Sequence, residues 1–379
     1  MIKTMRVLSI FGTRPEAIKM APLVNALSEH AQIESGVCVT AQHREMLDQV
    51  LNTFSIIPDF DLNIMTKQQD LIQITNQVLL ETKNIIEKTK PDWILVHGDT
   101  TTAFSASLAA FYAKIPVGHV EAGLRSHDNY APFPEEMNRK FSDLIANLHF
   151  APTKSAANNL LKENIPKSKI IITGNTVIDS LLFIVDRLRK DVKLQKEMEK
   201  QFSFLDKSKQ LILVTGHRRE NFGIGFENIC NGLLSLSNRS DVEIIYPVHF
   251  NPNVRNPVER LLTNNCNIYL IDPLDYVPFV YLMEQCYFII TDSGGIQEEA
   301  PALGKPVLVM RNVTERPEAI EEGTVRLIGT DKQKLVYEAN LLLDNSKHYK
   351  TMSKAHNPYG DGQASERIVH GLLKNSNDT

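Results

Sequence analysis

Residues Ile289–Glu299 have the sequence IITDSGGIQEE. The apolar start predicts a buried strand, and the serine and two glycines after it predict a tight turn into a helix. Glycines let the backbone approach a ligand closely, and the free N–H groups at a helix N-terminus favour a diphosphate. Glu299 then lies about one turn inside the helix, where it could accept hydrogen bonds from ribose hydroxyls. The alternative is a tight turn with surface glutamates and no ligand.

The same order of a short apolar run and a helix-length segment recurs along the chain. Strands are expected at Arg6–Phe11, Gly36–Thr40, Trp93–His97, Val117–Val120, Leu148–Ala151, Leu211–Thr215, Val242–Pro247, Asn267–Leu270, Phe288–Thr291 and Pro306–Val309. Helices are expected at Ala17–Leu27, Met46–Phe54, Leu71–Lys88, Phe104–Tyr112, Ser180–Phe202, Phe226–Leu236, Val277–Glu284, Ile296–Leu303 and Ser365–Leu373. This alternation predicts βαβ units, parallel sheets and an α/β fold.

The length of the chain predicts two domains, because 379 residues are shared among domains of about 150 residues each. We expect an N-terminal domain over residues 1–174, a C-terminal domain over 175–363, and a helix with a tail over 364–379, with the hinge near Ile172–Thr176. The last helix has no partner strand in the second half, so it is expected to return to the first domain. Ligands of open α/β sheets bind beyond the carboxyl ends of the strands, where functional residues are therefore expected.

The composition argues against several classes of protein. A net charge of −4 and a pI of about 6.3 provide no general basic field for a nucleic-acid partner. No run of 18 apolar residues is present, and Met1–Arg6 lead into a strand, so neither a membrane span nor a signal peptide is expected. The four cysteines form no C-x-x-C pair, which predicts buried free thiols and a reducing, cytoplasmic location. No cluster of metal-ligating residues has a convincing spacing, so no metal is expected.

The turn after the first strand, Phe11–Lys19, has the sequence FGTRPEAIK. It is neither a G-x-G-x-x-G motif nor a P-loop, which argues against dinucleotide and Walker-type sites. Thr13 and Glu16 match a capping box, which begins a helix at once. Arg14 and Lys19 then stand near the free N–H groups of that helix, which predicts an anion site; a plain helix cap is the alternative.

Carboxylates follow further strands of the first half. Asp99 follows one strand and Glu121 follows the next. Glu135 and Glu136 begin a helix behind Pro134, where acidic residues favour the helix dipole, so one of the two is expected to be structural. Like charges held together push their pKa values apart, which yields one acid and one base. The alternative for Asp99 is a helix N-cap.

A basic loop, Gly216–Gly223, follows a strand of the second half and has the sequence GHRRENFG. In it His217 precedes two arginines, which indicates phosphate binding or acid–base work rather than a structural histidine. His249 follows the next strand with a weaker pattern. Arg316 follows a later strand and adds positive charge near the same sheet edge.

Five segments together closely resemble the non-hydrolysing UDP-N-acetylglucosamine 2-epimerases of bacteria. They are Gly12–Pro22, His97–Thr100, Gly118–Arg125, Gly216–Asn221 and Thr291–Glu299, and the likeness covers roughly residues 5 to 373. The resemblance implies a GT-B architecture, in which two Rossmann-like domains with parallel sheets face a central cleft and the C-terminal helix packs back on the first domain. It also implies a homodimer.

The resemblance further implies the reversible epimerisation at C2 of UDP-N-acetylglucosamine to UDP-N-acetylmannosamine. In the family, the C2 proton is removed and UDP leaves by anti elimination, which forms 2-acetamidoglucal; UDP then adds back. Neither a nicotinamide cofactor nor an obligatory metal is implied. The product is implied to be a precursor of a cell-surface polysaccharide.

The residues that match the family's motifs fall into three groups. The catalytic group is implied to contain Asp99, Glu121, Glu135 and His217. The substrate and UDP contacts are implied to be Arg14, Lys19, Phe279, Ser293, Gly294, Gly295, Glu299 and Arg316. A second, allosteric UDP-N-acetylglucosamine is implied to bind at Gln42, His43, Arg218 and His249. The second domain is thus expected to hold UDP and the first to supply the carboxylates, so domain closure is expected to be part of the mechanism.

Alternative functions stay open at this point. The chain could be a GT-B glycosyltransferase, a 2-epimerase of a modified UDP-sugar such as a 2,3-diacetamido uronic acid, or a hydrolysing epimerase that releases free N-acetylmannosamine. A sensor that only binds a UDP-sugar is a further alternative. Three carboxylates argue against the sensor, because a pure binder of an anion gains nothing from them.

Overall fold

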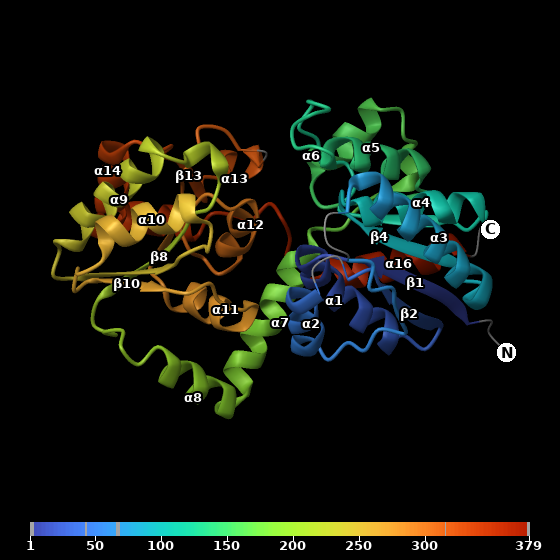
Figure 1. Ribbon diagram of the computed structural model, residues 1–379, viewed down its shortest axis with the longest axis horizontal. Helices are drawn as coiled ribbons and strands as arrows, with labels where there is room; N and C mark the ends of the chain where they lie inside the picture. The colour runs from blue at the N-terminus through green and yellow to red at the C-terminus, as the bar shows by residue number, and fades with distance from the viewer. Residues whose placement is uncertain (1–3, 42–43, 66–68, 315, 377–379) are drawn as a thin grey trace. The chain divides into compact units, whose positions relative to one another are not determined.

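The computed structural model describes residues 4–41, 44–65, 69–314 and 316–376 (Figure 1). The chain forms two compact units, of which the first contains Met1–Ser180 with Tyr359–Thr379 and the second contains Leu181–Pro358. In the described part of the chain, no helix combines the length and the apolar character that a membrane crossing requires.

The first unit is built on a seven-stranded parallel sheet with the strand order β3-β2-β1-β4-β5-β6-β7. Its strands are β1 (Met5–Phe11), β2 (Ile33–Val39), β3 (Phe60–Asp61), β4 (Trp93–His97), β5 (Val117–Val120), β6 (Leu148–Ala151) and β7 (Ile170–Ile172). The order reverses direction between β1 and β4, which makes the space beyond their carboxyl ends the topological switch point at which ligands bind in such sheets.

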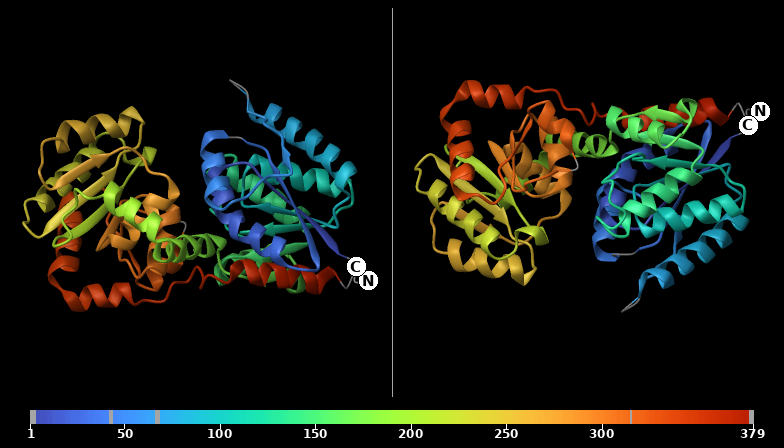
Figure 2. Two further views of the ribbon diagram at one scale, coloured as in Figure 1. Left: turned by 90° about the horizontal axis from the view of Figure 1, so that it is seen from below. Right: turned by 90° about the horizontal axis from the view of Figure 1, so that it is seen from above.

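Helices cover both faces of this sheet (Figure 2). One face carries α3 (Leu71–Thr89), α4 (Thr101–Tyr112) and α5 (Glu135–Ile145), and the other carries α1 (Arg14–Glu29), α2 (Arg44–Thr53) and α16 (Ala364–Ser376). The remaining elements are α6 (Lys154–Lys162), the 3-10 turn Lys167–Lys169 and the first turn of α7 (Thr176–Lys190).

The C-terminal helix α16 lies beside α1 on the first unit, as expected from the sequence. The Asp179 carboxylate accepts hydrogen bonds from the backbone N–H groups of Ala364 (3.2 Å) and Ser365 (2.7 Å), and so caps the start of α16. Ser180 belongs to the first unit as well, because its hydroxyl donates to the carbonyl oxygen of Ile18 on α1. The units therefore divide after Ser180 and before Tyr359, rather than at residues 174 and 363.

The second unit is built on a six-stranded parallel sheet with the order β10-β9-β8-β11-β12-β13. Its strands are β8 (Gln210–Thr215), β9 (Val242–Pro247), β10 (Ile268–Ile271), β11 (Phe288–Thr291), β12 (Val307–Val309) and β13 (Val325–Leu327). Its helices after α7 are α8 (Val192–Gln201), the 3-10 turn Arg219–Asn221, α9 (Ile224–Ser237), α10 (Pro252–Leu262), α11 (Tyr276–Gln285), α12 (Gly294–Ala302), α13 (Pro317–Glu321), α14 (Lys332–Asp344) and α15 (Ser346–Ser353).

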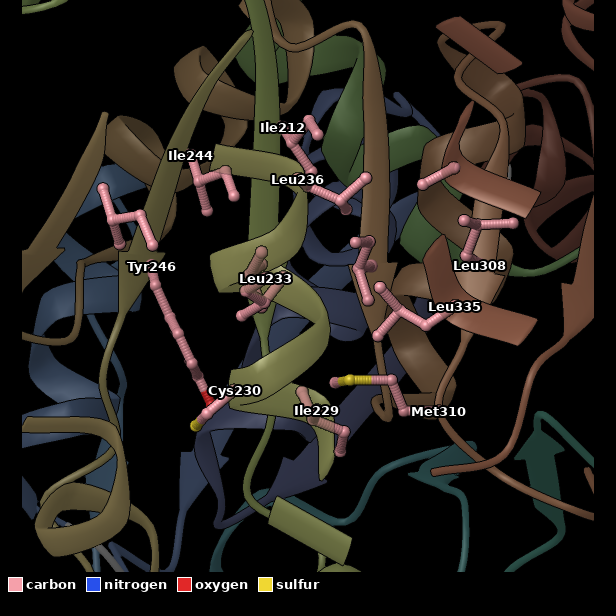
Figure 3. Packing of buried hydrophobic residues seen from close by; sticks show 14 of the residues in the cluster. Ile212, Ile229, Cys230, Leu233, Leu236, Ile244, Tyr246, Leu308, Met310 and Leu335 are labelled. Atoms are coloured by element: carbon pink, nitrogen blue, oxygen red, sulfur yellow. The ribbon is translucent and has the colours of Figure 1, made fainter. Parts of the chain in front are cut away.

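The core of the second unit lies between the sheet and the helix pair α9 and α14 (Figure 3). Ile229, Leu233 and Leu236 recur at helical spacing on α9, and all are buried against the strands. Tyr246 of β9 is fully buried, and its hydroxyl donates to the carbonyl oxygen of Gly216 at 3.3 Å. The packing of this face thereby fixes the start of the loop that follows β8.

The observed elements confirm the predicted α/β class with two Rossmann-like parallel sheets. Three short strands, β3, β7 and β13, were not expected, since two or three residues are too few to show an alternating pattern. The charged stretch Ser180–Phe202 is two helices instead of one, because Asp191 breaks it and caps α8 through the backbone N–H groups of Lys193 and Leu194. The four cysteines are free, but Cys266 is exposed.

Candidate functional site

A pocket of about 740 Å³ lies in the first unit beyond the carboxyl ends of β1, β4 and β5. It brings together the three carboxylates and the two cations that the sequence singled out. Its polar wall consists of Thr13, Arg14, Glu16, Lys19, His97, Asp99, Thr100, Thr101, Glu121, Glu135 and Asn138, together with Gln69. Its apolar lining consists of Pro15, Met46, Met65, Leu71, Ile74 and Pro134. The pocket therefore offers opposite charges within one partly enclosed space.

The capping box predicted at the start of α1 is present and links two loops of the pocket. Thr13 Oγ1 accepts from the backbone N–H of Glu16 at 3.4 Å, and the Glu16 carboxylate accepts from the N–H groups of Thr13 (2.8 Å) and Gly12 (3.0 Å). Glu16 also accepts from the hydroxyl of Thr100 at 2.7 Å, which ties the β1 loop to the β4 loop. Burial raises the pKa of Glu16 above its ordinary value, although these hydrogen bonds oppose the shift.

Glu121 lies directly after β5, and its carboxylate contacts two other side chains. The ammonium group of Lys19 forms an ion pair with its Oε2, and the side-chain amide of Asn175 donates to the same oxygen at 2.8 Å. Its side chain is 9% exposed. Glu121 also has a φ angle of +65°, in the left-handed region that non-glycine residues rarely occupy. Such strain is concentrated at functional sites, where the surroundings hold it in place.

Asp99 and Glu135 face the pocket in different ways. The Asp99 carboxylate is paired with the guanidinium of Arg139. The backbone carbonyl oxygen of Asp99 accepts a hydrogen bond from the side-chain amide of Asn138 at 3.0 Å. Glu135 Oε2 is buried and has no hydrogen-bond partner among the residues that the structure describes. Glu136 has the structural role expected of one of the pair, because it is fully buried and accepts hydrogen bonds from backbone N–H groups at 3.0 and 3.2 Å.

A buried network beneath the pocket was not foreseen from the sequence. The Asp143 carboxylate contacts His119 Nδ1 at 2.6 Å and accepts from the guanidinium of Arg125 at 2.7 Å. The other ring nitrogen of His119 donates to the carbonyl oxygen of Gly98 at 2.7 Å, which fixes the loop that carries Asp99. Burial would raise the pKa of Asp143, but His119 and Arg125 outweigh it and hold that pKa below its ordinary value.

Gly123, two residues after Glu121, gives a prediction on stability. Its φ is +86°, and a Cβ there would lie 2.3 Å from the carbonyl oxygen of Ala156. Gly123→Ala is therefore expected to cost about 2–5 kcal/mol, through left-handed strain and a backbone clash. Gly323→Ala is the matched control, since Gly323 also has a positive φ but nothing within 4 Å of a Cβ. Scanning calorimetry would count against the clash if both substitutions lowered the unfolding temperature equally.

In the second unit, the loop after β8 is fixed by a buried carboxylate that follows β11. Asp292 is fully buried and accepts from the backbone N–H groups of His217 (2.9 Å) and Arg218 (2.8 Å). The amide of Asn221 donates to it at 3.2 Å. Asp292 lies in the segment Ile289–Glu299, and it can hold the His217 loop because β8 pairs with β11.

The ring of His217 stands at the edge of this loop with a side-chain exposure of 47%. It stacks against the ring of His249 with centroids 5.5 Å apart. Desolvation lowers the pKa of His217 below its ordinary value, while the negative charge of Asp292 opposes that shift. The structure thus brings His217, Arg218 and His249 together, whereas Gln42 and His43 lie outside the described residues.

The turn from β11 into α12 has the form predicted from its sequence. Ser293 is the N-cap residue, and Gly294 and Gly295 begin the helix. A Cβ on Gly294 would lie 2.6 Å from a guanidinium nitrogen of Arg316, so glycine allows that arginine to lie against the helix start. Arg316 is held there by Glu298, whose side chain is 3% exposed. A cation therefore stands beside the free N–H groups of the helix.

Glu299 lies on α12 itself, and α11, which carries Phe279, contacts it through Tyr276. The Glu299 carboxylate is buried and accepts from the hydroxyl of Tyr276 at 2.8 Å. Phe279 lies one turn further along α11 and is half-buried. Across the described part of both units, no group of three or more His, Cys, Asp or Glu side chains is arranged to hold a metal ion.

Comparison with known proteins places this geometry in a family. The family model described as UDP-N-acetylglucosamine 2-epimerase matches residues 25–373. The UDP-N-acetylglucosamine 2-epimerase of Escherichia coli K12 is 59% identical over 372 residues, which cover 98% of this chain and 99% of that protein.

Solved structures of this family match the fold over nearly the full length of the chain. The UDP-GlcNAc 2-epimerase of Neisseria meningitidis, bound to UDP-GlcNAc, matches with a TM-score of 0.91 and 52% identity, covering 98% of this chain and 100% of that one. The UDP-GlcNAc 2-epimerase of Methanocaldococcus jannaschii matches with a TM-score of 0.85 and 34% identity, covering 98% and 100%. The family expected from the five sequence segments is confirmed: the chain belongs to the UDP-N-acetylglucosamine 2-epimerase family.

Proposed function

We propose that this chain interconverts UDP-N-acetylglucosamine and UDP-N-acetylmannosamine by epimerisation at C2. The observation that carries the proposal is the pocket in which Asp99, Glu121 and Glu135 stand with Arg14 and Lys19. The proposal is supported by the 59% identity to the Escherichia coli epimerase and by the UDP-GlcNAc bound in the Neisseria meningitidis structure.

The chemistry explains why such a pocket needs both acids and cations. The C2–H of the sugar has no adjacent carbonyl group, so its proton is not acidic enough for simple removal and return. If the C1–O bond to UDP breaks as the C2 proton is taken, the electron pair of the C2–H bond forms the C1–C2 double bond of 2-acetamidoglucal. The electron pair of the C1–O bond leaves with UDP. UDP then adds back to C1 while C2 receives a proton on the opposite face. The protein must supply proton-transfer groups for the sugar and stabilise the departing diphosphate.

We assign the proton transfers to the first unit. Glu121 and Glu135 differ in their surroundings, since Glu121 has an ion pair while one Glu135 oxygen is buried without a hydrogen bond. The reaction needs one group to remove the proton at C2 and another to return a proton on the opposite face. Asp99 completes the set, and Arg14 and Lys19 offer positive charge to the substrate's phosphates.

We assign the binding of UDP to the second unit. Ser293–Gly295 and Arg316 provide helix N–H groups and a guanidinium for the diphosphate, and Glu299 provides a carboxylate for the ribose hydroxyls. Phe279 provides an aromatic face on the uracil side. His217 stands on the loop that Asp292 fixes, where it can assist the departure of the diphosphate.

The test is incubation with UDP-N-acetylglucosamine in deuterated water, without nicotinamide and with EDTA present. We expect UDP-N-acetylmannosamine that carries deuterium at C2, because the proton removed from carbon is replaced from solvent. Proton NMR of the sugar region follows both the inversion and the exchange. Deuterium exchange in the presence of EDTA would also support catalysis without an obligatory metal.

The other outcomes separate the alternative functions. Free N-acetylmannosamine would indicate a hydrolysing epimerase, and inversion without deuterium would refute the elimination mechanism. No reaction would favour a glycosyltransferase or a sensor. A higher kcat/KM with a UDP-2,3-diacetamido uronic acid than with UDP-N-acetylglucosamine would reassign the substrate to the modified sugar.

A further inference from the structure

His97, the last residue of β4, is a buried histidine whose ring nitrogens have no partner in the described part of the chain. The residue is 3% exposed, and neither Nδ1 nor Nε2 has a hydrogen-bond partner among the described residues. The other buried histidines of the same unit, His119 and His149, each use both ring nitrogens. An imidazole carries at least one N–H donor, and a buried donor without a partner costs about 1–3 kcal/mol. Such a group in a native structure requires an explanation.

The surroundings of His97 indicate which partner it lacks. The ring forms part of the pocket wall, and its Nε2 lies 3.9 Å from Oε2 of Glu121, just beyond hydrogen-bonding distance. Burial lowers the pKa of His97 to about 3; Glu121 opposes that shift, and Lys19 and His119 add to it. The ring is therefore neutral near pH 7, and its relation to Glu121 is that of a neutral hydrogen-bonding group rather than an ion-pair partner.

In the structure, Lys19 supplies the Glu121 carboxylate with a contact that His97 does not make. Its ammonium group and the amide of Asn175 both contact Oε2 of Glu121, so that oxygen is already supplied with donors. In the proposed function, Lys19 also serves the substrate's diphosphate. A diphosphate attracts an ammonium group more strongly than a single carboxylate does, because it carries more negative charge. When Lys19 turns to the diphosphate, Glu121 loses its cation.

We propose that His97 is a positioning residue for Glu121, whose imidazole donates a hydrogen bond to that carboxyl group when Lys19 is drawn to the substrate's diphosphate. The inference rests on the proposed function. The Nε2–H tautomer serves both forms of Glu121, since a carboxylate oxygen and the carbonyl oxygen of a carboxylic acid both accept. Glu121 takes the proton from the sugar and later exchanges it with solvent, and His97 neither gains nor loses a proton. Glu121, freed from its cation, is a stronger base and keeps its orientation.

The first test uses three substitutions in the full chain, His97→Gln, His97→Asn and His97→Leu. A glutamine amide can reach the position of Nε2, an asparagine amide reaches only that of Nδ1, and leucine donates nothing. We expect kcat to fall on the order of 10- to 100-fold for the leucine and asparagine variants, and by less than about fivefold for the glutamine variant. KM and the Kd for UDP from calorimetry are expected to stay within about threefold, because His97 is not among the residues assigned to UDP.

The second test does not depend on turnover. In protein labelled with ¹⁵N-histidine, the ring resonances of His97 are assigned by their loss in His97→Gln, and UDP alone is the probe. We expect no titration of the free ring between pH 5.5 and 8. Saturation with UDP should shift the Nε2–H proton downfield by at least about 1 ppm, as a new hydrogen bond forms, and the shift should be absent in Glu121→Ala.

Three results would overturn the inference. They are a leucine variant within twofold of the wild-type kcat, a glutamine variant as slow as the leucine variant, and a His97 resonance that does not respond to UDP. A wild-type chain that epimerises no sugar would refute the proposed function instead. The UDP-induced shift would still decide whether His97 donates to Glu121, because that measurement requires UDP to bind but requires no turnover.

Discussion

Replacing Glu121 by Gln is expected to lower the turnover of UDP-N-acetylglucosamine by about 10²–10⁴-fold, with a change of less than about threefold in UDP affinity. A carboxamide keeps the size of the side chain and its hydrogen bond with Asn175, but it cannot take a proton from carbon. Apart from Arg14 and Lys19, the residues assigned to UDP lie in the second unit, and Glu121 is not among them, so the Kd for UDP should be nearly unchanged. Asp99→Asn and Glu135→Gln are expected to act in the same direction, since both carboxylates line the same pocket.

The control for this prediction is Glu87→Gln, the same chemical change on the surface of α3. Glu87 is 62% exposed and forms a helical pair with Lys83 at 3.3 Å, so kcat should stay within about twofold of wild type. Initial rates at saturating substrate, together with calorimetric titration of UDP, separate catalysis from binding. Near-normal rates for all three pocket variants would refute the assignment of the carboxylates.

The placement of the carboxylates in one pocket could be predicted from the sequence, because it depends only on the order of the strands. Asp99 and Glu121 each follow a short apolar run, and the ends of adjacent parallel strands meet at one sheet edge. The partners of these residues could not be predicted, because they come from distant segments. Lys19 pairs with Glu121 across 102 positions, whereas the capping motif predicted only an anion site at the start of the helix.

The strands of the fold could likewise be predicted where their own sequence shows the pattern, but not where pairing with a distant strand decides the structure. The strands at Trp93–His97, Val117–Val120, Leu148–Ala151, Val242–Pro247 and Phe288–Thr291 have the predicted bounds. Each is a buried run of central strand, so its apolar pattern is complete within the run. Strand β7 ends at Ile172, where the hinge was expected to begin, and it was not predicted because a run of three isoleucines does not reveal that a sheet edge is available to it. Pairing with β6 decides the structure of that segment.

Asp143→Ala is expected to destabilise the first unit by about 3–5 kcal/mol, the cost of removing one partner from a buried ion pair. The substitution leaves the guanidinium of Arg125 paired with Glu163 but not with residue 143, and it removes the carboxylate that contacts His119 Nδ1. Trp93 is the single tryptophan of the chain and is buried in β4, so its fluorescence during urea unfolding reports on this unit. The control is Asp241→Ala, which breaks a surface pair with Arg239 and should cost less than about 1 kcal/mol.

The effect of Asp143→Ala should also depend on pH in a definite direction. The pKa of Asp143 in the folded chain lies below its ordinary value, because His119 and Arg125 outweigh the burial that would raise it. The unfolded chain therefore binds the proton more readily, and the stabilisation by Asp143 is complete above the unfolded pKa of about 3.9. It is lost as the pH falls through the lower, folded pKa. The difference in unfolding free energy between wild type and Asp143→Ala should thus be constant from pH 8 to pH 5 and shrink below about pH 4. A difference that stayed constant down to the acid unfolding of the wild type would show that Asp143 acts by packing rather than by its charge.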